Sequence, residues 1–229
     1  MDRKPVSVKS YANIAIVKYW GKADAERMIP STSSISLTLE NMYTETKLSF
    51  LPEDATGDVM YIDDELQGEK ETVKASKVLD LFRTNPNQHV KIETWNNMPT
   101  AAGLSSSSSG LSALVKAANE LFQVGKTQSE LAQIAKFASG SSSRSFFGPL
   151  AAWDKDSGDV YQVETDLKLA MIMLVLTDQK KPVSSRDGMK LCTETSTSFP
   201  EWIKQSEQDY KDMLGYLKAN DFQAVGELT

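Results

Sequence analysis

Apolar and polar residues alternate through much of the N-terminal half of the chain, with the period of two that is typical of β-strands. Val6–Val17 is rich in β-branched residues, and two further strands are predicted over Ile35–Leu39 and Tyr43–Leu51. Val59–Ile62 runs into an Asp63-Asp64 turn, which indicates a short hairpin. A further strand face is formed by Val90, Ile92 and Thr94.

Helical spacing replaces this alternation in several places. Lys70–Phe82 predicts a helix that ends before Asn85-Pro86-Asn87, and Leu131–Ala138 predicts another. Beyond Pro182 the pattern is helical again through Trp202 and Leu217. Between the predicted helices Lys70–Phe82 and Leu131–Ala138, an amphipathic stripe predicts a further helix. Its apolar face carries Leu111, Leu114, Val115, Ala118, Leu121 and Phe122.

Two more strands are predicted towards the C-terminus, over Tyr161–Glu164 and Leu169–Leu176. The second is a continuous apolar run, so we expect it to be buried on both faces. It is far too short to span a bilayer. Strands and helices that mix without strict alternation favour an α+β fold.

The composition excludes several function classes. Of the 229 residues, 40% are hydrophobic and 24% are charged, and the net charge of −6 argues against nucleic-acid binding through a basic surface. The single cysteine, Cys192, and the single histidine, His89, cannot form a disulfide framework or a Cys/His zinc site. Since no signal peptide follows Met1, we expect a cytoplasmic protein with no nucleic-acid or membrane partner.

The most informative local feature is the serine-rich segment Gly103–Gly110, which leads directly into the amphipathic helix. Glycine lets backbone N–H groups approach an anion, a helix N-terminus carries positive partial charge, and serine hydroxyls add donors. The alternative is a flexible linker, but a linker is not expected between a strand and a strongly amphipathic helix. We therefore favour a phosphate-binding loop. It is not a Walker loop, because no Gly-Lys-Ser/Thr follows.

Two further segments could receive an anion. Ser139–Arg144 combines a guanidinium, which suits bidentate phosphate recognition, with neighbouring serines. An exposed arginine at a helix end explains this segment equally well. Lys18–Lys22 places two lysines and two aromatic residues at the end of a strand, where they form either a polyanion site or an aromatic anchor with solvated lysines. Basic segments in an acidic chain favour a small phosphorylated ligand.

Motifs in the same order along the chain resemble those of the mevalonate diphosphate decarboxylases. They are Asn13–Lys22, Pro30 with Ser33–Ser36, Pro99–Ser107, Ser139–Ser145 with Gly148 and Trp153, and Ser184–Met189. Together they are highly specific. Many family members have alanine at the positions of Ser105 and Ser108, a small change that leaves the backbone cradle possible.

The resemblance implies the two-lobed α+β fold of the GHMP kinase superfamily. Residues 1–181 would form a lobe like domain 2 of ribosomal protein S5, with the ATP phosphate loop and most of the substrate site. Residues 182–229 would begin a ferredoxin-like lobe. The implied reaction converts (R)-5-diphosphomevalonate and ATP to isopentenyl diphosphate, ADP, phosphate and carbon dioxide, with Mg²⁺. It belongs to the mevalonate pathway of isoprenoid biosynthesis, and the enzyme is usually a cytosolic homodimer.

By position, the resemblance also assigns substrate-binding residues. Lys18 would lie near the reacting hydroxyl, and Arg144 would contact the diphosphate or the carboxylate. The other substrate-binding candidates are Tyr19, Trp20, Gly21 and Lys22, then Ser139, Gly140, Ser141, Ser142 and Ser143, then Ser185, Arg186 and Met189.

The resemblance places the ATP phosphates in the serine-rich loop. Ser107 would bond to the phosphoryl groups or to Mg²⁺ and would act in catalysis with Lys18 and Arg144. Lys70 and Lys74 are further nucleotide candidates. The loop residues assigned to ATP are Ala102, Gly103, Leu104, Ser105, Ser106, Ser107, Ser108, Ser109 and Gly110.

Two alternatives stay open at this point. A sibling kinase acting on mevalonate or phosphomevalonate would share the superfamily fold, although such kinases carry a Gly-Glu-His segment where this chain has Trp20-Gly21-Lys22. A non-catalytic phosphometabolite-binding protein would bind the same ligands without turnover.

The resemblance further implies a catalytic aspartate in an Asp-Ala-Gly-Pro-like segment of the C-terminal lobe. No such segment occurs up to Thr229, and neither Asp24 nor Asp187 matches it by position. We therefore expect these residues to be part of a longer decarboxylase. On their own, they are expected to bind phosphates weakly and not to decarboxylate.

Overall fold

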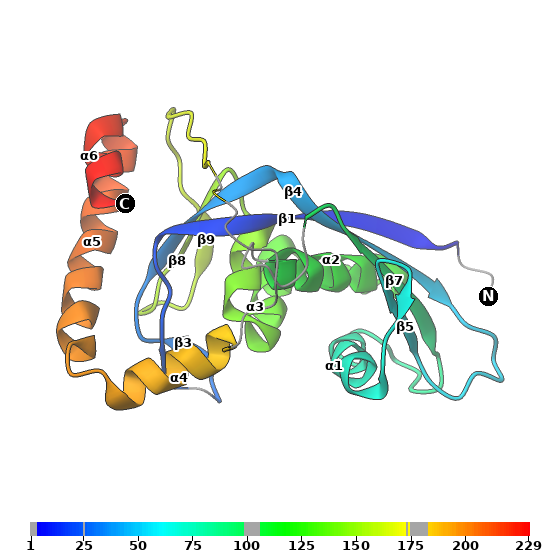
Figure 1. The fold of residues 1–229 in the computed structure, drawn as a ribbon. Helices are drawn as coiled ribbons and strands as arrows, with labels where there is room; N and C mark the ends of the chain where they lie inside the picture. Colours follow the sequence, from blue (N-terminus) through cyan, green and yellow to red (C-terminus); the bar gives the residue numbers. More distant parts are fainter. Residues whose placement is uncertain (1–3, 25, 99–105, 173, 175–182) are drawn as a thin grey trace.

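Two long antiparallel strands run the length of the molecule (Figure 1). They are β1 (Val6–Val17) and β4 (Ser34–Phe50) in the computed structural model, which describes residues 4–24, 26–98, 106–172, 174 and 183–229. The two strands predicted from Ile35 to Leu51 are in fact one. The register moves from Tyr11 opposite Tyr43 to Ala12 opposite Leu39, so residues 40–42 form a bulge that bends β4 without ending it.

The remaining strands extend the sheet from β4 in the order β6-β5-β7-β4-β8-β9. Because β4 is so long, its C-terminal half pairs with β7 and its N-terminal half pairs with β8. The predicted hairpin after Val59 is confirmed as β5 and β6. The strands are β5 (Val59–Ile62), β6 (Glu65–Leu66), β7 (Val90–Asn96), β8 (Leu150–Trp153) and β9 (Val160–Gln162), with a separate hairpin of β2 (Lys22–Asp24) and β3 (Ile29–Pro30).

Three helices share a core with the middle and one end of the sheet. They are α1 (Glu69–Leu79), α2 (Ser106–Leu121) and α3 (Gln128–Ala138), which confirms the helices predicted in this half of the chain. Their apolar stripes pack on strand residues such as Leu48, Val90 and Ile92, all of which are fully buried. Thr127 begins α3 with a capping box to Glu130.

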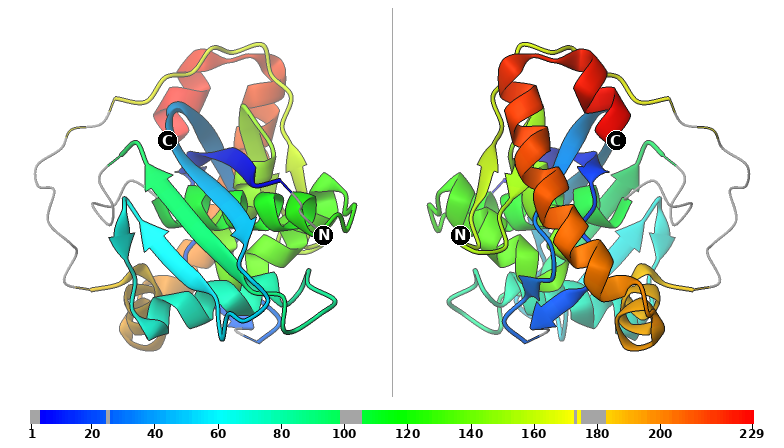
Figure 2. Two further views of the ribbon diagram at one scale, coloured as in Figure 1. Left: turned by 90° about the vertical axis from the view of Figure 1, so that its right-hand side faces the viewer. Right: turned by 90° about the vertical axis from the view of Figure 1, so that its left-hand side faces the viewer.

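A second core joins the C-terminal helices to the other end of the sheet. Figure 2 (right) shows α5 (Phe199–Ala219) in front of the strands, and α6 (Phe222–Leu228) packs against it. The side chains of Met213 and Leu217 on α5 are fully buried in one cluster with Ile16, Ile35 and Leu37 of the sheet. The helix α4 (Ser185–Thr195) precedes α5 and begins at the capping residue Ser184. The predicted lobe boundary at residues 181–182 stays a prediction.

The strand predicted over Leu169–Leu176 is wrong for the part that the structure describes. Residues 169–172 and 174 are not in a strand, and Ile172 and Leu174 are each 85% exposed. Leu169 and Met171 pack against the second core. The segment therefore buries one face only, because burial on both faces requires a packed layer on each side. No helix in the described ranges has the length and hydrophobicity to cross a membrane.

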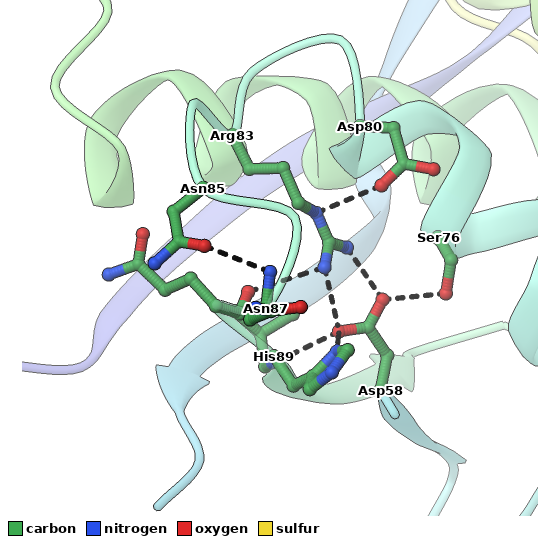
Figure 3. A network of polar contacts seen from close by, with 9 residues as sticks. Asp58, Ser76, Asp80, Arg83, Asn85, Asn87 and His89 are labelled. Carbon is green, nitrogen blue, oxygen red and sulfur yellow. Dashed lines mark hydrogen bonds and ion pairs between the residues drawn. The ribbon is translucent and has the colours of Figure 1, made fainter. Parts of the chain in front are cut away.

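A buried ion pair joins Arg83, in the turn after α1, to Asp58, the residue before β5 (Figure 3). Arg83 Nη2 donates to Asp58 Oδ2 at 2.6 Å, and the two side chains are 4% and 2% exposed. The Ser76 hydroxyl and the Val90 N–H donate to the same carboxylate at 2.6 and 2.9 Å. Burial alone would raise the pKa of Asp58, but these hydrogen bonds together hold that pKa below its ordinary value.

Candidate functional site

Arg144 lies in the interior on a short helix, η1 (Gly140–Phe146), and is only 2% exposed. Its Nε donates to the Ser36 hydroxyl at 2.7 Å and its Nη1 donates to the Ser34 hydroxyl at 2.9 Å. Within the described ranges, no carboxylate forms an ion pair with it. Burial lowers the pKa of Arg144 to about 10, so the guanidinium is still charged at neutral pH.

A buried cation without an acidic partner makes this a region of positive potential. An uncompensated buried charge costs several kcal/mol, and an anion that enters the site recovers part of that energy. The guanidinium carbon lies 6.0 Å from the ring centroid of Tyr19 and 5.8 Å from that of Trp153, which stabilise a cation only modestly. Because Arg144 is buried, the alternative of an exposed arginine at a helix end is wrong.

The start of η1 packs closely on the same two rings. A Cβ built on Gly140 would lie 3.0 Å from Trp153 and 3.1 Å from Tyr19. The rings in turn pack on each other with centroids 5.0 Å apart. This close approach fixes η1, and with it the position of Arg144.

We expect Gly140→Ala to weaken the binding of inorganic diphosphate roughly tenfold, because the added methyl group pushes η1 away from the rings and misplaces Arg144. Isothermal titration calorimetry measures the change. Gly57→Ala is the matched control, since a Cβ there meets nothing within 4 Å. Equal losses in the two variants would contradict the close-packing argument.

The residues from Lys18 to Gly21 lie between η1 and the C-terminal helices. Lys18 is exposed, with its ammonium group 5.7 Å from the centroid of the Trp20 ring. Tyr19 is buried, as the aromatic-anchor alternative requires. Gly21 has a φ of +89° and a Cβ there would lie 2.7 Å from the Phe199 ring, so only glycine fits this turn. Lys22 is half-buried in β2, opposite Pro30.

The helix α4 brings the third predicted segment to the same aromatic residues. Met189 packs against the cluster of Tyr19 and Trp153, and a Cβ on Gly188 would lie 3.7 Å from the Trp20 ring. Ser185, at the start of α4, is exposed. The side chain of Arg186 lies outside the described residues.

The N-terminus of α2 lies beside η1. The Ser142 hydroxyl donates to the Ser107 carbonyl oxygen at 3.5 Å, which brings the two serine-rich segments into contact. Ser107 is exposed, whereas Ser108 and Ser109 are fully buried. The Ser109 hydroxyl contacts that of Thr44 at 2.7 Å, and Gly110 is half-buried. The first turn of α2 contains no acidic residue that would offset the positive potential of the helix N-terminus.

The remaining loop residues assigned to ATP, Ala102, Gly103, Leu104 and Ser105, lie outside the described residues, as does the side chain of Ser106. Lys70 and Lys74 lie on α1 and are exposed, and the Lys74 ammonium pairs with Glu71 at 2.9 Å. Their role in nucleotide binding stays a prediction.

The serines from Ser139 to Ser143 divide into two kinds. Ser139 and Ser141 are half-buried with hydroxyls 3.2 Å apart, so they can still reach a ligand. Ser142 and Ser143 are buried, and the Ser143 hydroxyl donates to the Gly140 carbonyl at 2.9 Å. We infer that the buried serines shape η1 rather than contact a ligand.

Sequence reasoning missed the residues that hold this arrangement together. Ser34 and Ser36 bind the Arg144 guanidinium, and Asn13 Nδ2 donates to the Ser141 carbonyl at 3.0 Å and to the Ser145 hydroxyl at 2.8 Å. Trp153 is the aromatic wall beside Arg144. All four residues belong to the motifs that resemble the family, but the local sequence pattern did not indicate what any of them does.

A hollow of about 800 Å³ lies elsewhere in the molecule, between α1 and the β5–β6 hairpin. Its lining includes Asp58, Arg83 and His89, the groups drawn in Figure 3. Here the guanidinium and the carboxylate already satisfy each other, so little electrostatic attraction is left for a charged ligand. The surroundings of Arg144 are therefore the better candidate site.

Comparisons with known proteins show the family to which the chain belongs. A profile of the diphosphomevalonate decarboxylase-like N-terminal domain matches residues 10–163. The diphosphomevalonate decarboxylase of Saccharomyces cerevisiae is 37% identical over 86% of this chain, which covers 56% of that protein. The chain thus spans little more than half the length of this relative.

Solved structures match over nearly the whole chain. The mevalonate pyrophosphate decarboxylase of Streptococcus pyogenes is 65% identical with a TM-score of 0.95, covering 100% of this chain and 72% of its own. A protein called MDDEF, in complex with MVAPP, AMPPCP and magnesium, is 36% identical with a TM-score of 0.83, covering 98% and 72%. These matches confirm the predicted α+β GHMP kinase fold.

Proposed function

The chain belongs to the diphosphomevalonate decarboxylase family, and on that premise we propose that it supplies the substrate diphosphate site and the ATP phosphate site of an ATP-dependent diphosphomevalonate decarboxylase. The reaction would convert diphosphomevalonate and ATP to isopentenyl diphosphate, ADP, phosphate and carbon dioxide in the mevalonate pathway. We further propose a cytoplasmic homodimer as the working form.

The observation that carries the proposal is the buried Arg144 guanidinium, which no carboxylate of the described residues neutralises. A substrate with a diphosphate and a carboxylate supplies the missing negative charge. Charge-assisted hydrogen bonds to a guanidinium are about twice as strong as neutral ones. Ser139 and Ser141, half-buried at the start of η1, would complete the oxygen-binding shell.

The N-terminus of α2 would receive the phosphates of ATP. The first N–H groups of an α-helix have no partner within the helix and attract an anion, and Ser107 is exposed in the first turn of α2. The contact between Ser107 and Ser142 would place these phosphates beside the substrate, as transfer of a phosphoryl group requires. The MDDEF complex with AMPPCP supports a nucleotide in this family's site.

The donor set fits a magnesium ion held mainly by nucleotide phosphates. Within the described ranges, no cluster of three or more His, Cys, Asp or Glu side chains could cage a metal. Mg²⁺ is usually bound by one or two protein groups together with substrate phosphates, and Ser107 is the candidate here. When bound, the ion would neutralise charge on the transferred phosphoryl group.

Lys18 and the aromatic residues after it would hold the rest of the substrate. The exposed ammonium of Lys18 would lie near the tertiary hydroxyl that is phosphorylated, a step that creates a good leaving group. Loss of that phosphate and of carbon dioxide then forms the alkene. Positioning and charge neutralisation would account for most of the acceleration.

Ligand selectivity tests the proposal. Calorimetric titration should give tighter binding for diphosphomevalonate than for phosphomevalonate or mevalonate, because only the first places a diphosphate at Arg144. Preference for mevalonate or phosphomevalonate would instead identify a sibling kinase. In a longer protein that joins these residues to the C-terminal lobe, release of labelled carbon dioxide together with ADP separates an enzyme from a non-catalytic phosphometabolite-binding protein.

We expect Ser107→Ala to weaken AMPPCP binding in the presence of Mg²⁺ roughly tenfold, because one charge-assisted hydrogen bond or metal ligand is lost. The affinity for diphosphomevalonate alone should stay within about twofold, since Arg144 is intact. Calorimetry measures both constants. Unchanged AMPPCP affinity would count against a role for Ser107 and for the first turn of α2.

A further inference from the structure

One half-buried cation, Lys116, has no part in the proposed chemistry. The ammonium of Lys116, on α2, donates to the Ser10 hydroxyl on β1 at 3.0 Å and to the Ser145 carbonyl oxygen on η1 at 3.2 Å. It also lies 4.8 Å from the centroid of the Phe146 ring. A lysine that is partly withdrawn from water usually has partners for its charged ammonium group.

The partners of this ammonium are the negative end of η1 and a ring face. Ser145 is close to the C-terminus of η1, where carbonyl groups carry negative partial charge, and a ring face attracts a cation. Among the described residues of β1, β4, α3 and η1, no acidic group shifts the pKa of Lys116. Glu120 lies one turn further along α2 and forms no ion pair with it. Burial lowers this pKa to about 8.

Other polar contacts continue the connection through the interior. The Ser112 hydroxyl on α2 donates to the Ser10 hydroxyl at 2.7 Å. Asn13 on β1 binds Ser141 and Ser145, near the two ends of η1. At the start of α2, Ser107 accepts from Ser142. The helix η1 is thus tied to α2 at two separate points, and Lys116 provides the charged one.

We propose that Lys116 is a positioning residue that locks η1 against α2 and so holds Arg144 at a fixed place relative to the N-terminus of α2. The importance of this role for catalysis rests on the proposed function, in which η1 would hold the substrate and α2 would hold the ATP that transfers a phosphoryl group to it. A displacement of about 1 Å at such a site can lower a rate by about 100-fold.

The test compares Lys116→Met with Lys204→Met, whose lysine is 77% exposed and pairs only with an exposed glutamate. We expect Lys116→Met to weaken the binding of inorganic diphosphate about tenfold and to speed amide hydrogen exchange in residues 141–147 by at least about tenfold. The control should leave both unchanged. Equal diphosphate affinity and equal exchange in the two variants would overturn the proposal.

Two further measurements distinguish a failure of this proposal from a failure of the proposed function. If the wild-type protein binds no diphosphate, or if Arg144→Gln binds it equally well, the proposed function fails, while the exchange rates still decide whether Lys116 locks η1. If Lys116→Met does not fold, exchange in the wild-type protein decides. The pKa of Lys116 is lower when the side chain is packed against η1 than when it is released to solvent, so opening takes up a proton above pH 8. After correction for the intrinsic rate, protection of residues 141–147 should therefore rise as the pH rises through about 8. Constant protection up to pH values above about 9 would overturn the proposal.

Discussion

Arg144→Gln is expected to lower the affinity for diphosphomevalonate by about 30-fold to 4,000-fold, because removing one member of a buried charge pair costs about 2–5 kcal/mol. Glutamine keeps hydrogen-bonding capacity toward Ser34 and Ser36 but carries no charge. The fold should survive. In the absence of ligand the wild-type guanidinium is an uncompensated buried charge, so its removal is expected to be neutral or stabilising.

Calorimetry on the wild-type and variant proteins measures the affinity, and thermal unfolding checks the fold. Lys204→Gln serves as the control for a general loss of positive charge, since that lysine is 77% exposed. Affinity within about twofold of wild type for Arg144→Gln would refute its assigned role.

Asp58→Asn should destabilise the protein by about 3–5 kcal/mol, because it removes the buried counter-ion of the Arg83 guanidinium and leaves only the exposed Asp80 beside it. The matched control is Asp80→Asn. Asp80 pairs with the same arginine at 3.0 Å but is 60% exposed, so its loss should cost less than about 1 kcal/mol. Urea unfolding gives both values, and similar losses would contradict the distinction.

The pH dependence of the wild-type protein follows from the same carboxylate. The pKa of Asp58 is lower in the folded state than in the unfolded chain, so the unfolded state binds more protons as the pH falls below about 4. The stabilisation is complete above that pH and disappears as the pH falls through the lowered pKa. In Asp58→Asn this acid-dependent component should be missing.

Periodicity was sufficient to predict most of the secondary structure. Most strands and helices of the first 164 residues follow from apolar spacing, because each buries one face on a core. The short elements β2, β3, β8 and η1 were not predicted. The two features that periodicity predicted wrongly depend on tertiary contacts. The bend in β4 could not be distinguished from a break, since a bulge is defined only by its register against β1. The apolar run from Leu169 lacks the second packed layer that its composition suggested.

The candidate site was only partly predictable for the same reason. The motif around Arg144 could be found, but its burial depends on Ser34 and Ser36, which are 110 and 108 positions away in the sequence. Local pattern therefore could not separate a buried guanidinium from an exposed one. Nor could it show that Ser108 and Ser109 face the interior while Ser107 is exposed.

A crystal structure with diphosphomevalonate bound tests the central claim most directly, because one buried arginine lies on η1 and another lines the hollow between α1 and the β5–β6 hairpin. Our account predicts the diphosphate or carboxylate of the ligand within hydrogen-bond distance of the Arg144 guanidinium, beside η1 and the aromatic residues Tyr19 and Trp153. Ligand density next to Arg83, between α1 and the β5–β6 hairpin, with none beside η1, would contradict it.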